Sequence, residues 1–217
     1  MSTWPRRRIP RRPDLWPRVW RRHPLGIVLV LVLVCVLAWH RTHAPFGTDY
    51  DRYDGKTFTC IHVVDGDTID IGAPDGMRAS TRIRLWGVDT PETVKPGTPP
   101  MYYGHEASEY TKSCVNHKPV RIVLAQSKTR DKYGRLLAYV YPAGSGTMLN
   151  EEIVANGYGY ADTRFAHVWK ERFIQLENRA RKGKIGLWAG VTFDQMPDWR
   201  QRVEEHREKS KSANVGK

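Results

Sequence analysis

The stretch TFTCIHVVDGDTIDI, residues 57–71, predicts the architecture of the folded part of the chain. Residues 57–64 and 68–71 are rich in apolar and β-branched side chains, as expected of strands. The Asp65-Gly66 pair between them favours a tight hairpin turn. This stretch therefore indicates an antiparallel hairpin that carries a further carboxylate, Asp67, at the start of its second strand.

More strands are expected after this hairpin. Residues 82–86 read Arg-Ile-Arg-Leu-Trp and alternate with period two, so Ile83 and Leu85 share one face and the arginines share the other. Apolar runs at 120–124 and 136–141 supply the remaining strands. The chain therefore predicts a sheet of five short strands.

Three helices are expected among these strands: residues 106–115, residues 150–156 before Gly157, and a segment that ends at Gly183. The last has the clearest pattern, with apolar residues at spacings of three or four, namely Phe165, Trp169, Phe173, Leu176 and Ala180. We interpret this aromatic stripe as core. The elements together predict an α+β fold, a five-stranded OB-type β-barrel with three helices, preceded by one N-terminal transmembrane or signal-anchor helix.

The 217-residue chain divides by composition into five segments: an Arg-rich arm at 1–24, an apolar segment at 25–39, a polar linker at 40–55, a folded domain at 56–190 and a charged tail at 191–217. Of the formal net charge of +12, residues 1–48 hold +8. The overall basicity is therefore weak support for nucleic-acid binding by the domain. The part of the tail at 198–212 is charged on all sides, and we interpret it as a solvated helix or a frayed end.

The apolar segment LGIVLVLVLVCVLAW at 25–39 is suited to lipid. It is shorter than the about 17–25 residues of most spanning helices, but Trp20, Trp39 and the Arg21-Arg22 pair are suitable interfacial flanks. We favour an uncleaved anchor; a cleaved signal peptide and a buried element of a soluble domain are the alternatives. The expected location is membrane-anchored, with a cytoplasmic arm and an extracytoplasmic domain that is secreted if the segment is cleaved.

The cysteines are Cys35, Cys60 and Cys114, and their spacing is not that of a zinc site. Cys35 belongs to the apolar segment. Cys60 and Cys114 could pair in an oxidising compartment, or each could be a separately buried thiol. The sequence leaves both alternatives open.

Acids and arginines gather at the predicted turns. A carboxylate at the position of Asp67 suits a hard, oxygen-seeking cation, although Asp-Gly turns are more often structural. The charged turn at 129–135 ends in Arg135, at the start of a predicted strand. Each of these pieces alone is compatible with an ordinary solvated turn.

The segment 84–92 is more informative, because an arginine at the end of a strand is followed by acids on both sides of Pro91. Pro91 fixes its own backbone and disfavours a helical conformation at Thr90. The side chains of Asp89 and Glu92 and the carbonyl of Thr90 can therefore be presented rigidly. A loop of solvated charges is the alternative, and it explains Glu92 alone better than it explains the whole group.

In the order and spacing of its motifs the chain resembles the staphylococcal nuclease (thermonuclease) family. The motifs are Asp-Gly-Asp-Thr at 65–68, Arg-x-x-x-x-Asp-Thr-Pro-Glu at 84–92, Tyr-Gly-x-Glu-Ala at 103–107, Asp-Lys-Tyr-Gly-Arg-x-Leu-Ala-Tyr at 131–139 and Gly-Leu-Trp at 186–188. The resemblance covers about residues 56–189. It implies a calcium-dependent endonuclease that hydrolyses DNA, with RNA as a further candidate substrate.

The resemblance also implies a role for each matching position. The implied calcium ligands are Asp67, Asp89 and the carbonyl of Thr90. The implied catalytic residues are Arg84 and Arg135, which bind the scissile phosphate, and Glu92, which orients or deprotonates the attacking water. The implied contacts to the terminal phosphate of the substrate are Lys132 and Tyr133.

Elementary chemistry agrees with this assignment, because phosphodiester hydrolysis adds negative charge to an anionic phosphate. Arginine answers that need with a planar fork that bonds two phosphate oxygens and keeps its proton. A calcium site with few protein ligands binds weakly, at about 10⁻⁴–10⁻³ M, which suits an extracytoplasmic location.

The chain departs from the family at His105, where proline is expected, and at Thr163 and Phe165, where nucleotide-packing tyrosines are expected. Two other functions stay open. One is a non-catalytic nuclease-like binding module tethered to the membrane, and the other is a membrane scaffold whose arginine arm binds anionic lipid. The expected partners are a nucleic-acid substrate and the membrane, and we expect the nuclease domain to be monomeric.

Overall fold

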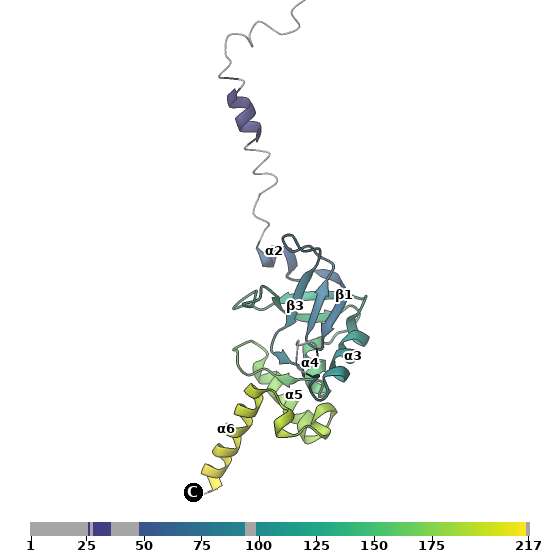
Figure 1. The fold of residues 1–217 in the computed structure, drawn as a ribbon, viewed down its shortest axis with the longest axis vertical. Helices are drawn as coiled ribbons and strands as arrows, with labels where there is room; N and C mark the ends of the chain where they lie inside the picture. The colour runs from purple at the N-terminus through teal and green to yellow at the C-terminus, as the bar shows by residue number, and fades with distance from the viewer. Residues whose placement is uncertain (1–25, 27, 36–47, 94–98, 216–217) are drawn as a thin grey trace, which may run out of the picture. The chain divides into compact units, whose positions relative to one another are not determined.

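The computed structural model of the chain describes residues 26, 28–35, 48–93 and 99–215 (Figure 1). The chain forms two compact units, Met1–Phe46 and Gly47–Lys217. In the first unit, Gly26 and residues 28–35 are helical. Among the described residues no helix combines the length and the apolar character needed to cross a membrane. The predicted arm at 1–24 and parts of the predicted segment at 25–39 lie outside the described residues.

The second unit is built on a closed barrel with the strand order β1-β2-β3-β6-β5 (Figure 1). The barrel strands are β1 (Thr57–Asp65), β2 (Thr68–Ile71), β3 (Thr81–Leu85), β5 (Pro119–Leu124) and β6 (Leu136–Pro142). Strands β3 and β6 pair in parallel, and the other neighbours pair antiparallel. The predicted hairpin and the predicted five-stranded barrel are confirmed.

The barrel interior follows the alternation of the strands. Ile83 and Leu85 of β3 are fully buried, whereas Arg82 points to solvent and Arg84 is half-buried. Complete burial of one such aliphatic side chain stabilises the fold by about 1.5–3 kcal/mol. The predicted inward and outward faces of β3 are therefore confirmed, and the outward face places Arg84 where it can serve a site.

The helices cover the barrel and exceed the predicted number. The predicted ones are α3 (Gly104–Val115), α4 (Leu149–Ala155) and α5 (Lys170–Lys182). The described residues add α2 (Asp49–Tyr53) and α6 (Asp198–Val215), with short 3-10 turns η1 (Gly186–Ala189) and η2 (Phe193–Gln195). A small second sheet pairs β4 (Val88–Asp89) with β7 (Tyr160–Ala161).

Helix α2 lies within residues 40–55, which we predicted as a linker. Thr48 caps the helix through its hydroxyl, which accepts the backbone N–H of Asp51. The ring of Tyr53 is buried, and its hydroxyl lies 3.1 Å from Thr81 Oγ1 inside the barrel. The described part of this segment therefore belongs to the domain, and ion pairing of Asp49 with Arg130 at 2.7 Å also holds it there. Residues 40–47 lie outside the described residues.

Helix α5 begins at Lys170, so the first part of the predicted aromatic stripe is not helical. Phe173 and Ala180 are buried as predicted, but Phe165 is 47% exposed and Trp169 is 39% exposed. The core interpretation is wrong for these two residues. The chain runs through a loop before α5, and there Phe165 packs against Trp86 with the ring centroids 5.2 Å apart.

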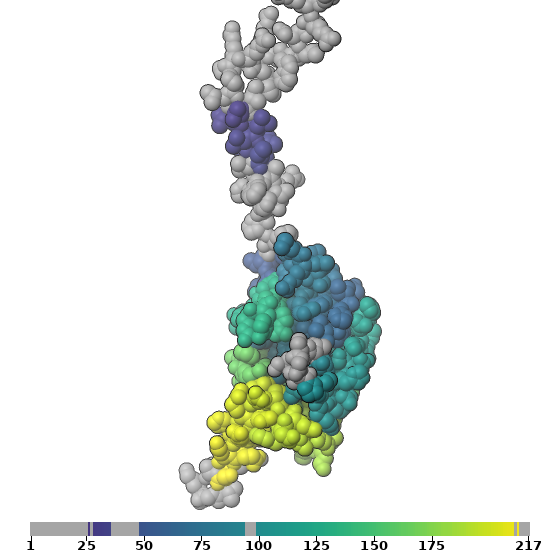
Figure 2. All heavy atoms as spheres, in the orientation of Figure 1, coloured from purple at the N-terminus to yellow at the C-terminus, as the bar shows by residue number. Residues whose placement is uncertain are grey.

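The charged tail also differs from the prediction. In the first two turns of α6, the side chains of Trp199, Arg200 and Glu204 are buried against the domain. Arg200 pairs with Glu177 of α5 at 2.9 Å and with Glu204 at 2.8 Å. Figure 2 shows this yellow C-terminal segment seated on the neighbouring green surface. From residue 205 onward the described side chains of α6 are exposed, as predicted for a solvated helix.

The cysteine thiols are unpaired. Cys60 is fully buried in the barrel, and Cys114 is half-buried on α3. Burial raises the pKa of the Cys60 thiol to about 11. Of the two alternatives left open by the sequence, the structure has the separate thiols.

Candidate active site

A cleft of about 650 Å³ opens on the barrel wall beside β3 and the charged turn before β6. Most of the predicted site residues line it: Arg84, Asp89, Glu92, Lys132, Tyr133 and Arg135. Additional polar residues line it as well: Lys128, Asp131, Asp162 and Arg164. Asp67 and Thr90 lie behind the cleft wall and are buried. The fold therefore brings all of the predicted positions to one place.

The carboxylate of Asp67 is held from two sides. Its Oδ2 accepts the backbone N–H of Thr90 at 2.8 Å, and its Oδ1 accepts the hydroxyl of Thr68 at 3.0 Å and the guanidinium of Arg84. The pairing of β2 with β3 sets Thr68 opposite Arg84. The hairpin, the strand β3 beside it and the backbone of Thr90 directly after β4 together hold this carboxylate in place.

Gly66 makes this arrangement possible because, without a side chain, it lets Thr90 lie close to the hairpin turn. A Cβ at this position would lie 2.7 Å from Thr90 Oγ1, well inside van der Waals contact. The carbonyl of Gly66 accepts the hydroxyl of Thr111 on α3 at 2.7 Å. The Asp-Gly-Asp sequence therefore serves a tertiary contact with Thr90 as well as a turn.

Asp89 lies on β4, where it pairs with Tyr160 of β7. Its Oδ1 faces Arg84, and Arg164 Nη2 lies 3.3 Å from the same oxygen. Its Oδ2 accepts the indole N–H of Trp199 at 2.7 Å. Asp67 and Asp89 therefore each have one oxygen held by a neutral N–H and the other facing Arg84.

The guanidinium of Arg84 bridges the two acids. One terminal nitrogen contacts Asp67, and the other contacts Asp89 and donates to the carbonyl of Val88 at 3.1 Å. The sequence assigned Arg84 to a phosphate; in the structure its fork neutralises two carboxylates that would otherwise repel each other. Burial raises the pKa of the nearby Asp65 carboxyl, against the opposing charges of Arg84 and Arg135.

The charged turn supplies the opposite wall of the cleft. Arg135 donates its Nε–H to Asp131 at 2.7 Å, and its backbone N–H donates to the other oxygen of Asp131 at 3.0 Å. Burial works against the ionised Asp131, but the bonds from Arg135 outweigh it and lower the Asp131 pKa. Lys132 and Arg135 both lie over the ring of Tyr133, which is 66% exposed. These residues form a positively charged, accessible surface.

Glu92 lies at the rim of the cleft, directly after the buried Pro91. Its Oε1 accepts the backbone N–H of Thr93 at 3.1 Å, and its backbone carbonyl accepts the N–H of Met101 at 2.9 Å. A carboxylate held at a solvent-facing rim can reach a water molecule beside a bound anion. The rigid presentation that Pro91 suggested is consistent with this position.

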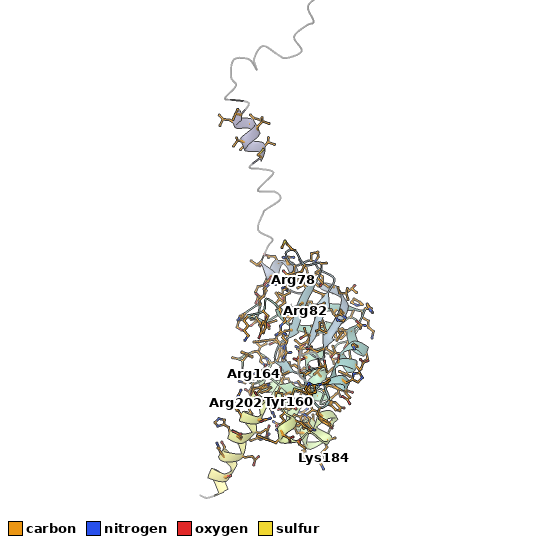
Figure 3. All side chains as sticks on the ribbon, in the orientation of Figure 1. Arg78, Arg82, Tyr160, Arg164, Lys184 and Arg202 are labelled. Carbon is orange, nitrogen blue, oxygen red and sulfur yellow. The ribbon has the colours of Figure 1, made fainter. Side chains whose placement is uncertain are left out.

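Sequence reasoning missed three residues of the site: Asp162, Arg164 and Trp199. Arg164 makes a bidentate pair with Asp162 at 2.8 and 2.7 Å and lies 4.5 Å from the ring centroid of Trp199. Figure 3 labels Arg164 in the lower part of the domain. Burial opposes its charge, but the bonds to Asp162 and the charge of Asp89 prevail and raise the Arg164 pKa. Only the departure from the tyrosine pattern around Thr163 and Phe165 marked this segment in the sequence.

The donor chemistry of the site fits a calcium ion in part. Asp67 and Asp89 direct carboxylate oxygens at one guanidinium, so hard oxygen donors converge on a small region. In the part of the chain that the structure describes, no three acidic, histidine or cysteine side chains gather into a fuller metal cluster. Such a donor set suits a weakly bound hard cation with a shell of waters better than a softer, tightly held metal.

Comparison with known proteins adds an independent finding. A profile of the family described as staphylococcal nuclease homologue matches residues 82–190. The chain is 35% identical to a thermonuclease of Staphylococcus hyicus over 168 residues, which are 76% of this chain and 96% of that protein. It is 34% identical to a thermonuclease of Staphylococcus intermedius over 164 residues, 75% of this chain and 94% of that protein. It is 33% identical to the endonuclease YncB of Bacillus subtilis over 157 residues, 70% of this chain and 71% of that protein.

Proposed function

We propose that this chain, which belongs to the staphylococcal nuclease family and is a phosphodiester hydrolase, is a calcium-dependent endonuclease that cuts DNA, with RNA as a further candidate substrate. The observation that carries the proposal is the convergence of Arg84, Asp89, Glu92 and Arg135 on one open cleft, with Asp67 directly behind Arg84.

Asp67, Asp89 and the carbonyl of Thr90 are the residues that we assign to calcium. When bound, the ion supplies positive charge close to the phosphate and lowers the pKa of a coordinated water. Asp67 is suited to this role because its Oδ2 is already held by Thr90, which leaves its Oδ1 toward the site.

The arginines are the residues that we assign to the scissile phosphate. In the structure one terminal nitrogen of Arg84 contacts Asp67 and the other contacts Asp89, so the assignment requires Arg84 to release both carboxylates when calcium binds them and to turn its fork to the phosphate. Asp131 holds Arg135 by Nε, so we assign the terminal nitrogens of Arg135 to the phosphate oxygens. Two planar donors that keep their protons stabilise the charge that develops on the phosphorus oxygens in the transition state.

Glu92 is the residue that we assign to the attacking water. Its rim position allows it to orient the water and accept its proton while the arginines hold the phosphate. Lys132 and Tyr133, on the exposed part of the charged turn, are assigned to a terminal phosphate of the substrate. The ammonium of Lys132 supplies charge there, and the hydroxyl of Tyr133 supplies a hydrogen-bond donor.

The test is degradation of plasmid DNA and of an RNA oligonucleotide by the full chain, in excess chelator and after addition of calcium or magnesium. Calcium should restore activity, and magnesium should restore little because it prefers a tight octahedral shell. Glu92→Gln should be inactive in calcium, because an amide cannot accept the proton of water. Full activity in excess chelator would remove calcium from the mechanism while leaving the nuclease assignment intact.

We further propose that the chain is an uncleaved membrane protein whose monomeric nuclease domain faces the extracytoplasmic side. The support is the arginine-rich arm before the apolar residues 25–39, which is the charge pattern of a cytoplasmic flank. Mass spectrometry of the protein from membranes should find the intact N-terminus, and protease added outside should remove the domain. A mature N-terminus near Trp39 would establish a cleaved signal peptide instead.

A further inference from the structure

Helix α6 reaches the candidate metal site through Trp199. The indole N–H donates to Asp89 Oδ2 at 2.7 Å, across 110 positions of sequence. Trp199 itself is buried, in a small cluster with Tyr160, Leu187 and Met196 that is separate from the barrel core. A part of the chain that follows the family match at 82–190 therefore contacts a residue that we assign to calcium.

Trp199 is held firmly enough to act on its partner. Its ring meets the ring of Tyr160 edge-on, with the centroids 6.3 Å apart, and Tyr160 is the strand partner of Asp89. The next residue, Arg200, makes buried ion pairs with Glu177 and Glu204. Removing one partner of such a buried pair leaves an uncompensated charge and is strongly destabilising, so these pairs hold α6 in place.

The contact decides which oxygen of Asp89 is available. With Oδ2 bound to the indole, Oδ1 is the oxygen that faces Arg84 and the cleft. Asp67 shows the same division, with Oδ2 held by the N–H of Thr90 and Oδ1 toward Arg84. The two carboxylates are thus oriented alike, but a backbone amide orients one and a distant side chain orients the other.

From this geometry we propose that Trp199 is a positioning residue that sets the calcium affinity of the site through Asp89, an inference that rests on the proposed function. A carboxylate that rotates freely loses conformational entropy when it binds a metal, and this loss lowers the affinity. A hydrogen bond from a fixed N–H orients the carboxylate before the metal binds, so less entropy is lost on binding. Arg164, stacked on Trp199 and 3.3 Å from Asp89 Oδ1, adds positive charge beside that oxygen without holding Oδ2.

The test compares Trp199→Phe with the matched control Trp188→Phe in the full chain. Trp188 packs against the same small cluster, but its indole nitrogen is buried without a hydrogen-bond partner among the described residues. Both variants lose an indole, and only Trp199→Phe loses a bond to Asp89. Incorporation of 3-benzothienylalanine at position 199 replaces the N–H by sulfur in a ring of the same shape, and it serves if the phenylalanine variant does not fold.

Two quantities are measured: the melting temperature as a function of calcium concentration, and the calcium midpoint for cleavage of an oligonucleotide. We expect the loss of the Trp199 N–H to weaken calcium binding by about tenfold or more, as typical for a lost partner of a metal ligand. Activity at saturating calcium should recover. Trp188→Phe should lower the melting temperature in chelator without moving either calcium midpoint.

An unchanged calcium midpoint in the Trp199 variants would overturn the proposal. Equal shifts of the calcium midpoint in Trp199→Phe and Trp188→Phe would also overturn it, because they would indicate a general loss of packing in the cluster. These failures are distinct from failure of the proposed function. If calcium neither raises the melting temperature nor supports cleavage in the wild-type chain, the calcium-dependent function falls first and this proposal falls with it.

Discussion

The candidate active site has two halves that are built in different ways. The barrel half consists of Asp67, Thr68, Arg84 and Thr90, whose contacts span at most 23 positions of sequence. The C-terminal half consists of Asp162, Arg164, His167 and Trp199, which lie around Asp89 or support the loop before α5; its longest contact to the site spans 110 positions. Asp89 is the residue where the two halves meet.

The two halves also differ in what holds them. Strand pairing and the backbone N–H of Thr90 orient the buried Asp67, so its position follows from the barrel and from the segment directly after β4. Side chains on a loop and on an added helix orient Asp89, and one of them, Arg164, keeps 38% of its side chain exposed. The comparison teaches that the barrel half orients Asp67, whereas the C-terminal half orients Asp89.

The largest effect is expected in the barrel half and in the charged turn. Arg84→Lys and Arg135→Lys keep the charge but lose the planar fork, and loss of one preorganised donor typically costs on the order of 10²–10³ in rate. Arg164→Lys is the matched control in the C-terminal half and should cost much less. Turnover on a single-stranded oligonucleotide in saturating calcium, with circular dichroism to verify folding, measures the difference. Near-normal turnover of Arg84→Lys and Arg135→Lys would contradict their catalytic assignment.

A smaller effect should follow from a methyl group at the hairpin turn. Gly66→Ala places a Cβ against Thr90 Oγ1, and overpacking of this kind costs about 1–3 kcal/mol of stability. Because Thr90 holds Asp67, calcium binding should weaken as well. Gly146→Ala is the control, since a Cβ there meets nothing within 4 Å. Equal melting temperatures and calcium midpoints for the two variants would show that the close approach is not needed.

The smallest effect concerns how the stability of the C-terminal half depends on pH. Burial is the main cause that lowers the pKa of His167 below its ordinary 6.5, and its Nδ1 lies 3.3 Å from the hydroxyl of Tyr139. The unfolded chain therefore binds more protons near this pH, so the contribution of His167 is complete above pH 6.5 and is lost as the pH falls through the folded pKa. Melting temperatures from about pH 7.5 to about pH 5 should fall less steeply for His167→Gln than for the wild type. Parallel curves would show that His167 does not couple this loop to pH.

Much of the barrel half could be predicted because its signals are local. A period of two in residues 82–86 determined that Arg84 points away from the core, and Asp-Gly followed by a β-branched run determined the hairpin. The order of the motifs then placed Arg84, Glu92 and Arg135 in one site, and the structure brings these residues to one cleft.

The aromatic stripe shows where a local signal fails. Residues 165, 169 and 173 have helical spacing, yet the helix begins only at Lys170, and Phe165 lies in the loop before it, packed on Trp86 just after β3. Tyr53 shows the reverse case, since nothing in the polar segment around it indicated that its ring enters the barrel. Periodicity records the average environment of a segment and carries no information on single contacts with distant residues.

By itself, the sequence determined the barrel and the hairpin, because strand alternation and turn chemistry act over a few residues. The order of its motifs determined the family and which residues are the candidates for the site. Only the tertiary structure decided that Arg84 bridges Asp67 and Asp89, that Arg164 lies beside them, and that Trp199 binds the far oxygen of Asp89. The charged tail has no apolar periodicity that would mark Trp199 as buried. The contact of Trp199 with Asp89 therefore appears only in the folded chain, where α6 docks on α5 through Arg200 and Glu177.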